Sequence, residues 1–111
     1  MNKQEGLTLI IYQKSNGKSP LIDWLECTIQ DSTIRARIKN RLRRIELGII
    51  GDYKRVSVNI FEIRLHFGSG YRIYFSKINN AIILLLCGGN KKTQKFDIRI
   101  AKEFLSDYLN N

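Results

Sequence analysis

The chain has 111 residues, 43% of them hydrophobic and only one of them proline, a composition that supplies one hydrophobic core and is not typical of a disordered protein. Its 19 lysine and arginine residues against 10 aspartate and glutamate residues give a net charge of +9. This excess favours a polyanionic partner, such as RNA, DNA, the ribosome or an acidic protein, over a merely basic surface.

Nothing in the sequence predicts a membrane segment or a metal centre. The longest apolar run, residues 81–87, is far shorter than the roughly 20 residues of a spanning helix, and the start of the chain lacks a signal-peptide pattern. Cys27 and Cys87 stand alone, so each is predicted to be a buried thiol in a reducing cytosol. With one histidine and no clustered carboxylates, we expect one cytoplasmic domain over 1–111 without metal or other cofactor.

The first half of the chain predicts one strand followed by two helices. The strand covers 7–12, and an Asn-Gly turn follows it. Ser19 and Pro20 are typical of a helix start, and this helix is expected to end near Ile29. Asp31 or Ser32 can cap a second helix, which runs to Leu47 and stops at Gly48. Its apolar stripe consists of Ile34, Ile38, Leu42 and Ile45, and its other faces are rich in arginine.

The second half predicts four strands and a final helix. Strands are expected over 53–58, 60–67, 71–76 and 81–87, with turns at 68–70 and 79–80. Thr93 can cap a last helix that runs to Leu109, with Ile98, Ala101, Leu105 and Tyr108 as its apolar stripe. The order β-α-α-β-β-β-β-α predicts an α+β fold: an antiparallel β-sheet of four to five strands with two N-terminal helices and one C-terminal helix.

The alternation along 60–76 predicts one polar and one apolar face for the central hairpin. The apolar face, which includes Ile63 and Ile73, is expected to pack on helices. The polar face is expected to hold Glu62, Arg64, His66, Arg72 and Tyr74. A solvated face with a cross-strand pair such as Glu62 with Arg72 is the simplest interpretation, and an exposed Arg72 would then be replaceable by alanine without unfolding the chain.

The same residue types also fit cleavage of RNA by its own 2′-hydroxyl. That reaction needs a base, donors that stabilise charge on the phosphate, and an acid for the leaving oxygen. His66 is suited to proton transfer, and Arg64 and Arg72 are suited to binding two phosphate oxygens. Lys91 follows a strand and precedes a helix whose first amides add positive potential. Asp97, early in that helix, is either a structural cap residue or a proton acceptor.

Other features allow both structural and functional interpretations. The basic helix face over 35–44 is either solvated or bound to RNA. Gly88 and Gly89 match no phosphate-binding loop and indicate unusual backbone angles or close packing. Trp24 is predicted to belong to the core. The residues expected to contact RNA or the ribosome are Lys54, Arg41, Arg44, Lys92 and Gln94.

The chain resembles the RelE/ParE superfamily of type II toxin–antitoxin toxins, and more closely its HigB-like branch of addiction-module killer proteins. The resemblance covers nearly the whole chain. Its markers are DWL at 23–25, the RI..RL.R.E.G run at 37–48, GDYKRV at 51–56, EIRLHFGSGYRIYF at 62–75 and LLCGGNKKTQKFDI at 85–98.

The resemblance implies a small toxin that a co-encoded helix-turn-helix, HigA-like antitoxin neutralises in a hetero-oligomer. Many members enter the ribosome and cleave mRNA without metal. The family's functional positions map to Arg64, Arg72, Lys91 and Asp97. Two departures stand out: Glu62 replaces a lysine that relatives carry, so that His66 or Lys54 would substitute, and Phe96-Asp97 replaces a tyrosine region.

Two functions of different classes therefore follow from the sequence. The first is a ribosome-dependent mRNA endoribonuclease that blocks translation. The second is a non-enzymatic ParE-type toxin that inhibits DNA gyrase on the same fold, because fold does not fix function. The presence of His66, Lys91 and Asp97 favours the nuclease, since a binding toxin needs no residues for proton transfer.

Overall fold

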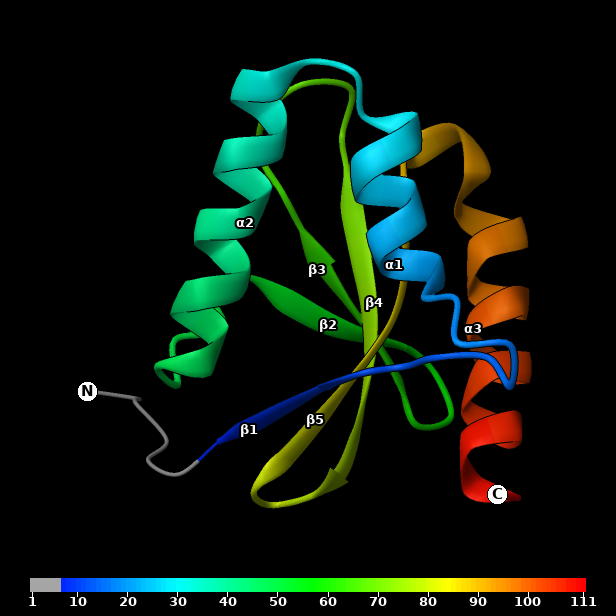
Figure 1. The fold of residues 1–111 in the computed structure, drawn as a ribbon. Helices are drawn as coiled ribbons and strands as arrows, with labels where there is room; N and C mark the ends of the chain where they lie inside the picture. The colour runs from blue at the N-terminus through cyan, green and yellow to red at the C-terminus, as the bar shows by residue number, and fades with distance from the viewer. Residues whose placement is uncertain (1–6) are drawn as a thin grey trace.

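A five-stranded sheet forms the centre of the molecule in a computed structural model that describes residues 7–111 (Figure 1). The strand order is β1-β5-β4-β3-β2. The strands are β1 Thr8–Ile11, β2 Tyr53–Ser57, β3 Ile60–Arg64, β4 Arg72–Asn79 and β5 Ile82–Gly89. The predicted α+β class is confirmed. The sheet is mixed, however, because β1 pairs with β5 in parallel, a direction that the apolar pattern of a short strand does not encode.

Three main helical segments surround this sheet. They are α1 Pro20–Asp23, which continues as the π-helical turn η1 Trp24–Thr28, then α2 Ser32–Glu46, and α3 Gln94–Leu109 after the 3₁₀ turn η2 Lys91–Thr93. The first predicted helix is thus α-helical only as far as Asp23. The Ser19 hydroxyl accepts a hydrogen bond from the Ile22 amide, and the Asp31 carboxylate caps α2. Gly48, with φ of +87°, follows α2 as predicted.

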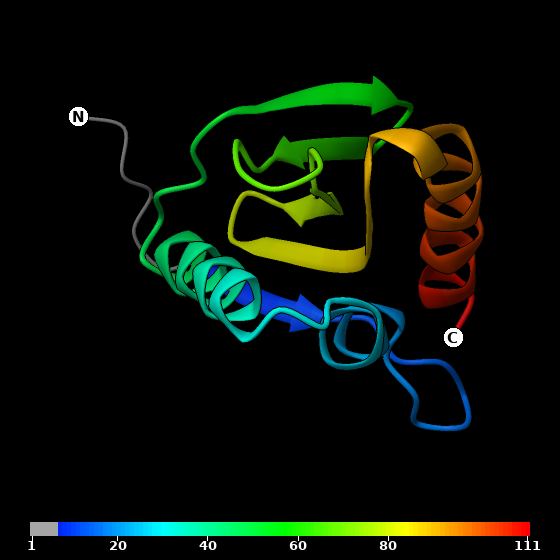
Figure 2. The same cartoon turned by 90° about the horizontal axis from the view of Figure 1, so that it is seen from above.

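The helices cover opposite sides of the sheet (Figure 2). On one side, α1, η1 and α2 bury residues such as Leu25 and Ile38 against Ile63 and Ile73. On the other side, Ala101 of α3 packs in a second cluster on the alternate residues of the strands. The apolar stripes predicted on α2 and α3 therefore face the sheet, as expected. The predicted polar face of the hairpin is different, because α3 covers part of it.

Two glycines allow the close packing at the end of β5. A Cβ on Gly88 would collide with the indole of Trp24, and a Cβ on Gly89 would collide with the Asp97 carboxylate on the other side of the sheet. Neither glycine has a positive φ, so close approach explains this pair and unusual backbone angles do not. Trp24 packs against the core, as predicted.

Several local predictions need correction. Strand β3 ends at Arg64, three residues earlier than expected, because the chain leaves the sheet there and enters a turn with positive φ at Gly68 and Gly70. Thr93 does not cap α3 through its side chain; Asn90 caps the preceding 3₁₀ turn instead. Cys27 is exposed, whereas Cys87 is buried and its burial raises the thiol pKa to about 12. Within 7–111, no helix combines the length and apolar character needed to cross a bilayer.

Candidate active site

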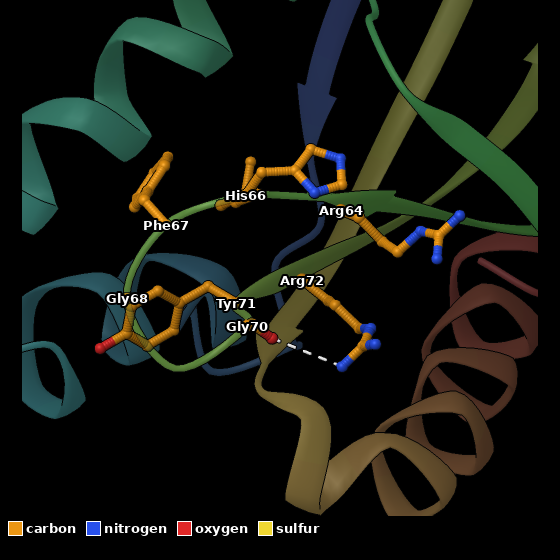
Figure 3. A pocket seen from close by; sticks show the side chains of 8 residues that line it. Arg64, His66, Phe67, Gly68, Gly70, Tyr71 and Arg72 are labelled. Carbon is orange, nitrogen blue, oxygen red and sulfur yellow. Dashed lines mark hydrogen bonds between the residues drawn. The ribbon is translucent and has the colours of Figure 1, made fainter.

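An open hollow of about 300 Å³ lies at the turn between β3 and β4 (Figure 3). Its lining residues are Arg64, Leu65, His66, Phe67, Gly68, Gly70, Tyr71 and Arg72. Arg64 and Arg72 are opposite each other in the antiparallel register, so they share one face of the sheet. Figure 3 shows both guanidinium groups extending toward the side of α3, whereas Tyr71 and Phe67 point toward the other helices. The structure thus brings together the two arginines that the sequence singled out.

Arg72 is held by a buried carboxylate. Its Nε lies 3.3 Å from Oε2 of Glu62, whose side chain is fully buried, and only 13% of the Arg72 side chain is exposed. Tyr74 and Gln94 donate hydrogen bonds to the same Glu62 oxygen, at 3.1 and 2.7 Å. The predicted Glu62–Arg72 pair is confirmed. The expectation of a solvated face is wrong here, because the first turn of α3 covers Glu62 and Tyr74.

Arg64 and His66 are joined by an acid that sequence reasoning missed. Oδ2 of Asp52, in the loop before β2, lies 2.7 Å from Nε2 of His66 and 3.8 Å from Nε of Arg64. The hydrogen bond with His66 is the main cause that lowers the pKa of Asp52, and the charge of Arg64 acts in the same direction. His66 is exposed beyond the end of β3, so it adjoins the arginines from the loop and not from the strand face. The GDYKRV marker contains Asp52, but no sequence pattern indicates its contact with His66, which is 14 positions away.

Asp97, in the first turn of α3, faces the sheet. Its side chain is packed over Gly89, which is opposite Arg72 in the register, and the Thr93 hydroxyl donates a hydrogen bond to its Oδ2 at 2.5 Å. Burial raises the pKa of Asp97, although the bond from Thr93 opposes that shift. Of the two roles that the sequence left open, this geometry supports a structural one directly. Its position beside the Arg72 pairing leaves it close to the candidate site.

The lysines of the prediction are exposed around this site. Lys91 lies beside the hairpin turn, since its Cβ is 3.6 Å from the place where a Cβ of Gly70 would be. Lys92 is exposed on the same 3₁₀ turn. Lys54 is opposite Glu62 in the register of β2 and β3, and its side chain is exposed. Gln94, predicted to contact RNA, donates a hydrogen bond to Glu62.

A second hollow, the α2 groove, adjoins the first. Its volume is about 320 Å³, and it is lined by Arg37, Asn40, Arg41, Arg44, His66 and Phe67. His66 and Phe67 line both hollows, so the two hollows are neighbours. The Arg41 guanidinium donates to the Ile50 carbonyl at 3.1 Å, and burial together with the charge of Arg44 lowers its pKa. Arg41 and Arg44, which the sequence predicted to contact RNA, therefore lie in one basic groove, together with Arg37 and Asn40 of the same basic helix.

Within residues 7–111, no group of three or more histidine, cysteine, aspartate or glutamate side chains is arranged to hold a metal ion. The residues present at the hollow are instead paired cations and carboxylates, with one imidazole. Such an arrangement can bind an anion, stabilise added negative charge and transfer a proton.

Comparison with known proteins places this arrangement in context. Residues 23–105 match the family described as "Phage derived protein Gp49-like (DUF891)". The matched segment contains η1, α2, both hollows and most of α3. The chain is also similar to an uncharacterized protein of Haemophilus influenzae, with 42% identity over 79 residues, which cover 71% of this chain and 79% of that protein.

Proposed function

The chain belongs to the Gp49-like family, a RelE-type family associated with the toxins of toxin–antitoxin systems, and on this premise we propose that it is such a toxin and cleaves mRNA. The observation that carries the proposal is the pair Arg64 and Arg72, opposite each other on one sheet face and beside an open hollow that His66 also lines. Two guanidinium groups at a fixed spacing match the oxygens of one phosphate.

The proposed reaction is attack of a ribose 2′-hydroxyl on the adjacent phosphorus. His66 accepts the hydroxyl proton, the new P–O2′ bond forms, and the P–O5′ bond breaks. The leaving 5′-oxygen takes a proton, for which exposed Lys91 and buried Asp97 are the candidates on the α3 side. Arg64 and Arg72 stabilise the charge that builds on the phosphate oxygens. No step requires a metal ion.

We further propose that cleavage occurs in the ribosome and that a helix-turn-helix antitoxin of the HigA-like kind neutralises the protein in the cytoplasm. The net charge of +9 supports a partner with a phosphate backbone. The exposed lysines Lys54, Lys91 and Lys92, together with the α2 groove, supply cations on both sides of the hollow. Ribosomal RNA would contact these surfaces while one message strand occupies the hollow.

The test is induced expression of the chain alone in bacteria, with mapping of mRNA 5′ ends. Wild type should arrest growth and cut messages within translated regions, whereas Arg64→Ala should do neither. Arg99→Ala, which removes the same charge from an exposed site on α3, is the matched control and should remain toxic. Intact messages in arrested cells, with loss of DNA supercoiling, would instead identify a gyrase inhibitor, and unimpaired growth would contradict both functions.

A further inference from the structure

Asp52 is held in place from both sides of its loop. The backbone amide of Arg64 donates to the Asp52 carbonyl at 3.2 Å, which ties the loop to β3. The Arg41 guanidinium donates to the Ile50 carbonyl and packs against Gly51, whose φ of +83° suits glycine. The carboxylate is therefore presented to His66 by a fixed backbone, although both side chains are exposed to solvent.

The chemistry of the pair determines which imidazole nitrogen carries the proton. The hydrogen bond with His66 lowers the pKa of Asp52, so the carboxylate is ionised near neutral pH and can only accept. The bonded nitrogen, Nε2 of His66, must then be the N–H donor. In the neutral ring the free lone pair is consequently on Nδ1.

From this geometry we propose that Asp52 is the positioning residue for His66: it fixes the ring so that Nδ1 accepts the proton of the substrate 2′-hydroxyl, and it stabilises the imidazolium that results. The inference rests on the proposed RNA cleavage for its functional part. The hydrogen bond with Asp52 holds the ring at the wall shared by the two hollows.

The other charged groups that face His66 are all cations. Arg64 and Arg72 line the first hollow with it, and Arg37, Arg41 and Arg44 line the α2 groove with it. These arginines disfavour a positive charge on the ring. Within the part of the chain that the structure describes, Asp52 is the carboxylate that pairs with His66. Replacing Asp52 should therefore leave the imidazole without a carboxylate partner among the described residues.

The first experiment is an NMR measurement of the imidazole tautomer, which is unambiguous because the chain contains one histidine. In the neutral ring of wild type, the nitrogen shifts should show Nε2 protonated and Nδ1 bare, and Asp52→Asn should increase the share of the other tautomer. Asp23→Asn removes an exposed aspartate on α1 that forms no ion pair among the described residues, and it should leave the tautomer ratio unchanged. An equal tautomer ratio in wild type and Asp52→Asn would overturn the inference, whatever the activity of the protein.

The second experiment is a double-mutant cycle on RNA cleavage. Asp52→Asn should lower kcat on the order of tenfold with little change in KM, less than the 10²–10⁴-fold of a general base itself. In a His66→Gln background the same change should have no further effect, because Asp52 acts through His66. An equal loss in both backgrounds would overturn the positioning role. A tautomer ratio that changes in Asp52→Asn, together with a wild-type protein that cuts no RNA, would retain the pairing and refute the nuclease.

Discussion

The two arginine sets of this molecule differ in what neutralises them. On the sheet, Arg72 is paired with buried Glu62, and Arg64 lies near Asp52. In the α2 groove, Arg37, Arg41 and Arg44 have no carboxylate within 4 Å among the described residues. Arg41 is even crowded by a like charge, since Arg44 contributes to lowering its pKa. The arginines of one hollow are thus paired with acids, whereas those of the neighbouring groove are not, within residues 7–111.

The difference indicates that the two arginine sets have different functions. A paired arginine is fixed in direction by its acid, which suits stabilisation of one phosphate in one geometry. The charge of an unpaired arginine is not neutralised by a neighbouring acid. Such a charge suits attraction of a phosphate backbone through counterion release, without sequence preference. We therefore expect substitutions on the sheet to change the chemical step and the fold, and substitutions in the groove to change binding and its salt dependence.

The largest effect is expected for Arg72→Ala. Loss of the guanidinium should reduce cleavage roughly 10²–10³-fold, as loss of one oxyanion donor does. It also leaves Glu62 buried without its cation, which should cost the lower part of about 3–5 kcal/mol, because Tyr74 and Gln94 still bind the carboxylate. Chemical denaturation and single-turnover cleavage measure the two losses.

A companion variant separates these losses. Glu62→Gln combined with Arg72→Ala removes the orphaned charge, so it should recover most of the stability while remaining inactive. Arg64→Ala is the comparison on the same face: its acid is exposed and 3.8 Å away, so its effect on stability should be about 1 kcal/mol or less. If Arg72→Ala alone proved as stable as wild type, the pairing with Glu62 would carry no structural weight.

The intermediate effect concerns the α2 groove. Replacing Arg37 and Arg44 together by glutamine should weaken binding of a single-stranded RNA and lower the slope of log affinity against log salt by about 1.4, or ~0.7 for each lost phosphate contact. The rate of bound-substrate cleavage should not change. Lys39→Gln is the matched control on the same helix, because Lys39 is already paired with Glu26 at 3.2 Å. Fluorescence anisotropy across a salt series gives the slopes; a fall in kcat with an unchanged slope would erase the distinction between the two sets.

The sheet face and the loops differ in how much of their structure could be predicted from the sequence. Alternating polarity was enough to place Arg64 and Arg72 on one face and to pair Glu62 with Arg72, because a two-residue period is a local property. It could not show that α3 covers that face, since burial of Glu62 depends on a helix that begins 32 residues later. The exposure expected for Arg72 was wrong for this reason.

Loop contacts were the least predictable. Asp52 meets His66 only after two strands and a positive-φ glycine have set the loop. Asp52 belongs to no periodic pattern, and His66 lies beyond the end of β3, outside the strand to which the alternation assigned it. Cys27 was expected to be buried because thiols usually are, but it is exposed on the π-helical turn. The α2 stripe was predictable, whereas the union of Arg37 and Asn40 with Phe67 in one groove required the tertiary fold.

The smallest expected effect compares the two aspartates beside the arginines, through the pH dependence of stability. Burial raises the pKa of Asp97, so the folded chain binds its proton more tightly than the unfolded chain, and this contribution is lost as pH rises through the folded value. The bond with His66 lowers the pKa of Asp52, so its contribution is lost as pH falls. Between about pH 3 and pH 5, acidification should therefore increase the stability of wild type relative to Asp97→Asn and decrease it relative to Asp52→Asn. Urea titrations across this range measure both differences. Equal signs would mean that a shared charge network, and not the separate burial and pairing of the two acids, controls both.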